Sequence, residues 1–148
     1  MKSKKTEKLI EYGKSKLFEA VMPTYLLDEA YHFLVWNETF DEVVARHLNL
    51  RLGMHAVEFI THCENRKECL ERSAEVFAVG KNPVVDHEPL IYKTKRYGKI
   101  HFHKFATSFH HTELDLIVWI VTLNICGADK LDLLLSDIMA TIDRVNHS

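Results

Sequence analysis

LDLIVWIVTLNICG, residues 114–127, is the most apolar stretch of the chain, and the expected fold depends on it. We place it on a helix that begins at Thr107 or Ser108 and ends before Gly127. On such a helix the Leu, Ile and Val side chains point outward on nearly every side. A helix that is apolar all round is a buried, central one. The stretch therefore predicts a buried central helix.

Apolar residues recur at helical spacing in most of the remaining chain. The predicted helices span residues 4–21, 24–36, 39–63, 66–79 and 128–146. The period changes to two over residues 90–104, where apolar and polar side chains alternate on either side of Arg96-Tyr97-Gly98. That alternation is typical of a β-hairpin.

These elements predict a mainly α protein. The 148 residues, 47% of them hydrophobic, suffice for one domain with a real core but are too few for two. We therefore expect a single-domain helical bundle over residues 1–148. It should contain five or six helices, with a small β-hairpin at about residues 90–104 inserted before the buried central helix.

A polar stripe lies on the predicted helix 39–63. Its members follow at steps of four, four, three and four residues: His47, Arg51, His55, Glu58 and His62. On a helix they fall within roughly 80° of one face. The neighbouring positions on that face are apolar, and unpaired polar groups are costly to bury. The stripe therefore predicts either a site or a polar network.

A matching pair lies on the predicted central helix. If the two helices face each other, five side chains converge: His55, Glu58, His62, His111 and Asp115. Facing helices commonly build metal sites from such side chains, and mixed histidine and carboxylate ligands suit Zn²⁺, Fe²⁺ or Mn²⁺. Two other interpretations stay open: a buried hydrogen-bonded network without metal, and a kink at Gly53 that leaves the stripe exposed.

Two basic segments stand out from an otherwise acidic chain with a net charge of −2. Six lysines lie within residues 1–16, and five basic residues lie within residues 89–104. Cationic and imidazole side chains can hold phosphate or an acidic partner. The candidates for phosphate or partner binding are Arg51, Lys93, Lys95, Arg96, His101 and His103.

Three functions remain open. The first is a metal-binding helical-bundle protein that hydrolyses a phosphate-containing substrate with a divalent metal. The second is a non-catalytic partner-binding or regulatory protein whose polar network is structural. The third is a nucleic-acid-binding module that uses the basic N-terminal helix and the hairpin. No nucleophile motif or phosphate-binding glycine loop occurs, so no catalytic residue is assigned and enzymatic activity stays undecided.

The setting is expected to be cytoplasmic, without membrane contact. No apolar run reaches about 18 residues, and the lysine-rich start lacks the apolar stretch of a signal peptide. The three cysteines form no CxxC pair and are expected to stay reduced. A homodimer or another protein partner is compatible with these features.

Overall fold

The protein is described here from a computed structural model. It covers residues 4, 7–8, 11, 21–76, 84–85, 89–112 and 115–146. Most of the helix predicted over residues 4–21 lies outside this part of the chain. Among the described helices, none is both long and apolar enough to cross a membrane.

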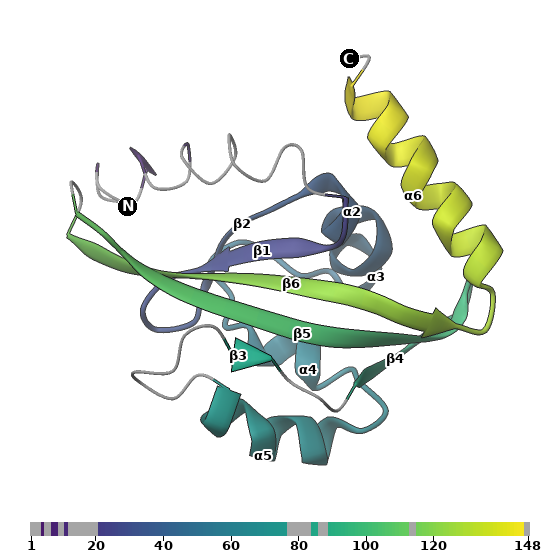
Figure 1. Ribbon diagram of the computed structural model, residues 1–148, viewed down its shortest axis with the longest axis horizontal. Coiled ribbons are helices and arrows are strands. Elements are labelled where there is room, and N and C mark those ends of the chain that lie inside the picture. Colours follow the sequence, from purple (N-terminus) through teal and green to yellow (C-terminus); the bar gives the residue numbers. More distant parts are fainter. Residues whose placement is uncertain are drawn as a thin grey trace.

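The molecule is built on one antiparallel sheet, not on a helical bundle (Figure 1). Its strands are β1 (Thr24–Leu27), β2 (Phe33–Trp36), β3 (Val84–Val85), β4 (Leu90–Thr94), β5 (Gly98–His111) and β6 (Leu116–Ala128). Their order is β2-β1-β6-β5-β3, and β4 also pairs with β5. The hairpin predicted over residues 90–104 is present, but β5 continues well past it. The prediction of a mainly α bundle is wrong.

The apolar stretch 114–127 forms the central strand β6, not a helix. β6 pairs with β1 on one side and β5 on the other, so its backbone groups are satisfied within the sheet. Val121 and Leu123 point into the main core, whereas Val118 packs into a second cluster on the other face. A strand that contributes apolar side chains to both faces shows no alternation, which explains why the sequence predicts a buried helix here.

Helices connect β2 to β3: α2 (Glu38–Phe40), the π-helical turn η1 (Asp41–Ala45), α3 (Arg46–Leu48), α4 (Val57–Ile60) and α5 (Arg66–Val76). The longer helix α6 (Leu131–Asn146) follows β6. The helices predicted over 66–79 and 128–146 correspond to α5 and α6. The helix predicted over 24–36 is instead strands β1 and β2, whose aromatic and aliphatic side chains favour a sheet.

The long helix predicted over residues 39–63 is interrupted twice. Asn49 adopts a left-handed conformation with φ 53° directly after α3, and Gly53 has φ 93°. Both conformations lie outside the right-handed helical region. The chain resumes a helix only at α4, so its two halves share no common face.

The main core lies between the helices and one face of the sheet. Phe40 of α2 and Phe59 of α4 are fully buried, with ring centroids 6.0 Å apart. Phe40 also packs against Tyr25 of β1 at 5.0 Å, and Phe59 packs against Tyr92 of β4 at 5.7 Å. This row of aromatic rings joins the helices to both ends of the sheet and fixes how they are placed.

Helix α6 packs against the edge of this core. Leu134, Ile138 and Thr141 are buried against the rest of the protein. In Figure 1 the helix begins beside the end of β6 and projects past the sheet toward its C-terminal end.

Candidate functional site

The polar stripe does not form a buried site. His47 lies on α3, Arg51 and His55 lie in the connection to α4, and Glu58 and His62 lie on or just after α4. All five side chains are exposed. The break at Asn49 and Gly53 turns them to solvent, as the kinked-helix interpretation expected.

The expected metal ligands are not brought together. Among the described residues, no group of three or more His, Cys, Asp or Glu side chains is placed to hold a metal ion. His55 instead forms a β-bridge with His32, with the two rings 5.5 Å apart. Asp115 lies in the turn between β5 and β6, where its carboxylate is 2.8 Å from Nε2 of His110. His111 ends β5 opposite Leu116, and its side chain lies outside the described part.

The basic hairpin residues, by contrast, do gather at one place. Lys93, Lys95 and Arg96 belong to a pocket of about 490 Å³ between α3 and the β4–β5 turn. His47 and Leu48 of α3 line its other side, opposite the hairpin residues 92–97. The remaining predicted phosphate or partner ligands, Arg51, His101 and His103, are not among the lining residues. His101 and His103 point to the opposite face of β5 from the buried Phe102.

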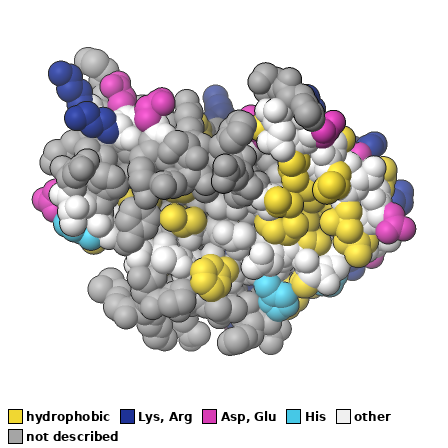
Figure 2. All heavy atoms as spheres, turned by 45° about the horizontal axis from the view of Figure 1, so that its top comes forward, with side chains coloured by type: hydrophobic (Ala, Val, Ile, Leu, Met, Phe, Trp, Pro, Cys, Tyr) yellow, Lys and Arg dark blue, Asp and Glu magenta, His cyan; other side chains and the backbone are white. Residues whose placement is uncertain are grey.

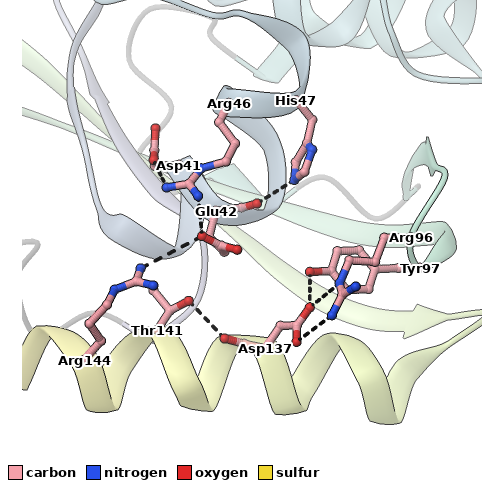
Figure 3. Close-up of polar contacts among 9 residues, drawn as sticks. All are labelled: Asp41, Glu42, Arg46, His47, Arg96, Tyr97, Asp137, Thr141 and Arg144. Atoms are coloured by element: carbon pink, nitrogen blue, oxygen red, sulfur yellow. Dashed lines mark hydrogen bonds and ion pairs between the residues drawn. The ribbon is translucent and has the colours of Figure 1, made fainter.

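One wall of this pocket is attached to helix α6 by an ion pair. Arg96 donates to Asp137 from Nε (2.6 Å to Oδ2) and from Nη2 (3.2 Å to Oδ1). The hydroxyl of the buried Tyr97 donates to the same Oδ2 at 2.6 Å. Figure 3 shows both side chains reaching from the hairpin to Asp137. We call these three residues the Asp137 clamp.

The clamp changes the acidity of its members. Hydrogen bonds from Arg96 and Tyr97 hold the pKa of Asp137 below its usual range. Burial, together with Asp137, raises the pKa of Tyr97 to about 12. Asp137 is therefore a carboxylate and Tyr97 a neutral donor at physiological pH, which is the charge state that the clamp requires.

Backbone contacts reinforce the attachment. The turn before β5 lies against the start of α6, where Lys130 N donates to Tyr97 O and Asp129 N donates to Lys99 O, both at 3.0 Å. The Asp129 carboxylate accepts from Lys99 N at 2.9 Å. Gly98 has φ 71°, and a Cβ there would lie 2.6 Å from Asp129, so glycine is required by both conformation and space.

A second polar group joins α6 to η1. Glu42 lies 3.0 Å from Arg46 and 3.9 Å from Arg144 of α6 through the same buried oxygen, Oε2 (Figure 3). No hydrogen bond to that oxygen comes from the described residues, among which the ion pairs with Arg46 and Arg144 compensate its charge. His47 contacts the backbone oxygen of Glu42 through Nε2 at 2.9 Å. The pocket wall on α3 is thus connected to the residue that faces Arg144.

The sequence did not single out Asp137, and it predicted Tyr97 only as an exposed aromatic at a contact surface, whereas Tyr97 is buried. Asp137 is one of several acids on an amphipathic helix, and Tyr97 was a turn residue. Arg96 and Asp137 are 41 residues apart, so no local spacing relates them. The Arg96–Asp137 pair could have been suggested only by knowing which side of α6 packs against the β4–β5 turn.

One charged side chain is buried away from this site. Lys104 of β5 is 1% exposed and points into the main core on the same strand face as Phe102. Burial and Cys69 raise the pKa of the Cys63 thiol to about 12, and the Lys104 charge opposes that effect. Cys63 is therefore a neutral thiol at physiological pH.

No protein-family model matches the sequence, and no curated protein matches it either. Solved structures resemble its fold. The PAS domain of BvgS from Bordetella pertussis superposes with a TM-score of 0.57 at 15% identity, covering 90% of this chain and 98% of that one. The LOV protein of Rhodobacter sphaeroides superposes with a TM-score of 0.57 at 11% identity, covering 95% of this chain and 83% of that one.

A PAS domain from a two-component sensor histidine kinase gives a TM-score of 0.50 at 14% identity, covering 81% of this chain and 98% of that one. With structural neighbours of this kind and no grouped ligands among the described residues, the metal-binding hydrolase interpretation is wrong. Neither the phosphate substrate nor the nucleic-acid-binding alternative finds support in these comparisons. The sheet order and these likenesses show that the chain has the fold of PAS and LOV domains.

Proposed function

We propose that this protein is a non-catalytic regulatory domain that acts on a second copy of the chain through helix α6. The observation that carries this proposal is an apolar stripe on α6. Leu131, Leu135 and Met139 are 37%, 40% and 64% exposed. Figure 2 shows hydrophobic side chains gathered along this part of the surface. Contiguous exposed apolar side chains on a soluble domain mark an interaction surface.

The spacing of the apolar residues supports a second helix as the occupant. Leu131, Leu135 and Met139 follow at steps of four, so they lie in one row along the exposed side of α6. Such rows of side chains interdigitate when two helices pack together. Because a two-fold pair uses the same surface on both partners, one stripe suffices for a homodimer.

The way α6 is held supports a regulatory role. The Asp137 clamp and the Glu42–Arg144 ion pair are polar contacts at a partly exposed boundary, whereas the buried contact of the helix rests on Leu134, Ile138 and Thr141. Polar contacts of this kind change with local charge more readily than a packed core does. One structurally similar PAS domain comes from a two-component sensor histidine kinase, and such a device is consistent with that setting.

Light scattering coupled to size-exclusion chromatography tests this proposal. We expect the full chain to be dimeric and the Leu135→Glu/Met139→Glu double variant to be monomeric, because each charge would be buried in the pair. Ser136→Glu places the same charge on the exposed surface beside the stripe and should stay dimeric. A monomeric wild-type chain, or a dimer that survives the double substitution, would refute pairing through α6.

A further inference from the structure

The pocket between α3 and the β4–β5 turn has the size and charge of a ligand site. Its volume of about 490 Å³ falls within the usual range for small-molecule sites, about 300–1,000 Å³. Lys93, Lys95, Arg96 and His47 contribute to its lining, and no Asp or Glu does. The three permanent cations among them, Lys93, Lys95 and Arg96, favour an anion at this concave surface.

Two of these cations are available to a ligand. Lys93 and Lys95 are exposed, and neither takes part in the ion pairs found among the described residues. The nearby Lys99, by contrast, is paired with Glu64 at 3.1 Å. The pocket therefore keeps two ammonium groups whose charge no described carboxylate neutralises.

The lining of the pocket also includes apolar groups. Leu48 is half-buried, whereas Tyr92 and Tyr97 are almost fully buried and expose little of their rings. Tyr92 stacks on Phe102, with ring centroids 6.5 Å apart, which holds its ring in place. Basic side chains beside Leu48 suit a small organic anion better than an inorganic ion, because the carbon skeleton of the ligand gains apolar contact.

Arg96 connects this pocket to the Asp137 clamp. Its guanidinium carries five N–H donors, of which two are directed at Asp137. A second anion at the pocket side of the guanidinium would share its charge with Asp137 and weaken each contact. The coupling is reciprocal: the factor by which the bound anion weakens the Arg96–Asp137 contact is the factor by which that contact weakens binding of the anion. Removing the Asp137 charge should therefore strengthen anion binding.

We infer that this pocket is a regulatory site for a small organic anion bearing carboxylate or phosphate groups. Lys93, Lys95 and Arg96 bind the anion, and its arrival loosens helix α6 by competing with Asp137 for Arg96. The effect on α6 rests on the proposed role of that helix, whereas the anion site does not.

Calorimetric titration of the full chain with citrate and, separately, with pyrophosphate at low ionic strength tests the site. We expect saturable binding of one anion per chain, with an affinity that falls about tenfold in the Lys93→Gln/Lys95→Gln variant, because two charge-assisted contacts are lost. Lys67→Gln removes an exposed lysine of α5 outside the pocket and should leave the affinity unchanged.

Preference for citrate assigns a carboxylate ligand, and preference for pyrophosphate assigns a phosphate ligand. Asp137→Asn should bind the preferred anion several-fold more tightly than the wild type. If neither anion binds, or if binding is the same in the Lys93→Gln/Lys95→Gln variant, the site is refuted.

Hydrogen exchange of α6 with and without the bound anion tests the coupling. We expect the α6 amides to exchange several-fold faster in the complex, and unchanged exchange despite pocket-dependent binding would overturn the coupling. If the chain proves to be monomeric, anion binding and the hydrogen exchange of α6 can both still be measured, because each is a property of a single chain. Failure of the proposed function and failure of this inference are therefore distinguishable.

Discussion

The guanidinium of Arg96 and the carboxylate of Asp137 meet in a two-point contact across 41 residues of sequence, with N–O distances of 2.6 and 3.2 Å. Two parallel N–H···O bonds hold two structural elements together and also fix their relative orientation. Here the two elements are the β4–β5 turn, which lines a basic pocket, and helix α6, which bears an exposed apolar stripe. This contact is therefore the most direct route by which the pocket could influence α6.

Asp137→Asn should loosen α6 without unfolding the sheet. The amide keeps the shape of the side chain but loses the negative charge. That charge attracts Arg96 and strengthens the hydrogen bond that the carboxylate oxygen Oδ2 accepts from the Tyr97 hydroxyl. We expect hydrogen exchange of the α6 amides to accelerate several-fold, while exchange in β5 and β6 stays unchanged. Asp132→Asn, which removes the same charge from an exposed position on α6, is the matched control. Equal acceleration in both variants would contradict a specific clamp.

The attachment of α6 should weaken at acidic pH. The pKa of Asp137 is lowered in the folded protein, so the clamp stabilises the fold fully above the ordinary aspartate pKa of about 3.9. The stabilisation is lost as the pH falls through the lower, folded-state pKa, where the carboxylate takes up a proton. Thermal unfolding of wild type and Asp137→Asn over acidic and neutral pH measures this. The difference in unfolding temperature between wild type and Asp137→Asn should vanish at the most acidic pH. A difference that stays constant with pH would contradict a stabilising role of the ionised Asp137.

Gly98→Ala should destabilise the protein more than Gly53→Ala does. Both glycines have positive φ, so either substitution should cost about 1–2 kcal/mol of conformational strain. At Gly98 the new Cβ also collides with Asp129, which adds about 1–3 kcal/mol, whereas no atom lies within 4 Å of the corresponding position at Gly53. Urea unfolding of the two variants gives the comparison. Equal losses would mean that the turn and the start of α6 are not in close contact.

Thiol reagents should label Cys126 well before Cys63. Cys126 is exposed, whereas Cys63 is 1% exposed and burial raises its pKa to about 12. A buried neutral thiol is a poor nucleophile. In a timed reaction with a disulfide reagent we expect one fast equivalent in the native protein, and Cys126→Ser should abolish it. Fast labelling that persists in Cys126→Ser would show that the core around Cys63 opens readily.

Phe40→Ala should lower the free energy of unfolding by about 3–5 kcal/mol. Phe40 is fully buried and its ring packs against those of Tyr25, Phe33 and Phe59. Phe105→Ala removes the same ring from a side chain that is 36% exposed and should cost clearly less. Chemical unfolding of the two variants measures the difference. Comparable losses would contradict the placement of the core on the helix-covered face of the sheet.

Part of the site was predictable from sequence. Lys93, Lys95 and Arg96 were predicted to bind phosphate or a partner, and the structure places all three around one pocket, whose ligand stays a proposal. Their spacing around a hairpin turn is local information, and a turn keeps neighbouring residues close in any fold. Arg51, grouped with them for its charge, lies outside the pocket, because charge alone does not say which segments meet.

The sequence by itself determined the elements whose pattern is local: the mostly polar helix α5, the amphipathic helix α6, and the hairpin that begins with β4. Each has one solvent-facing side, so its periodicity is visible in the residue order. Only the tertiary structure decided that residues 114–127 form a strand. β6 contributes apolar side chains to clusters on both faces of the sheet, and a segment that is apolar on both sides has no period that separates strand from helix. The partners β1 and β5 settle it by pairing with its backbone, and the Arg96–Asp137 contact likewise exists only because the folded sheet brings the turn to α6.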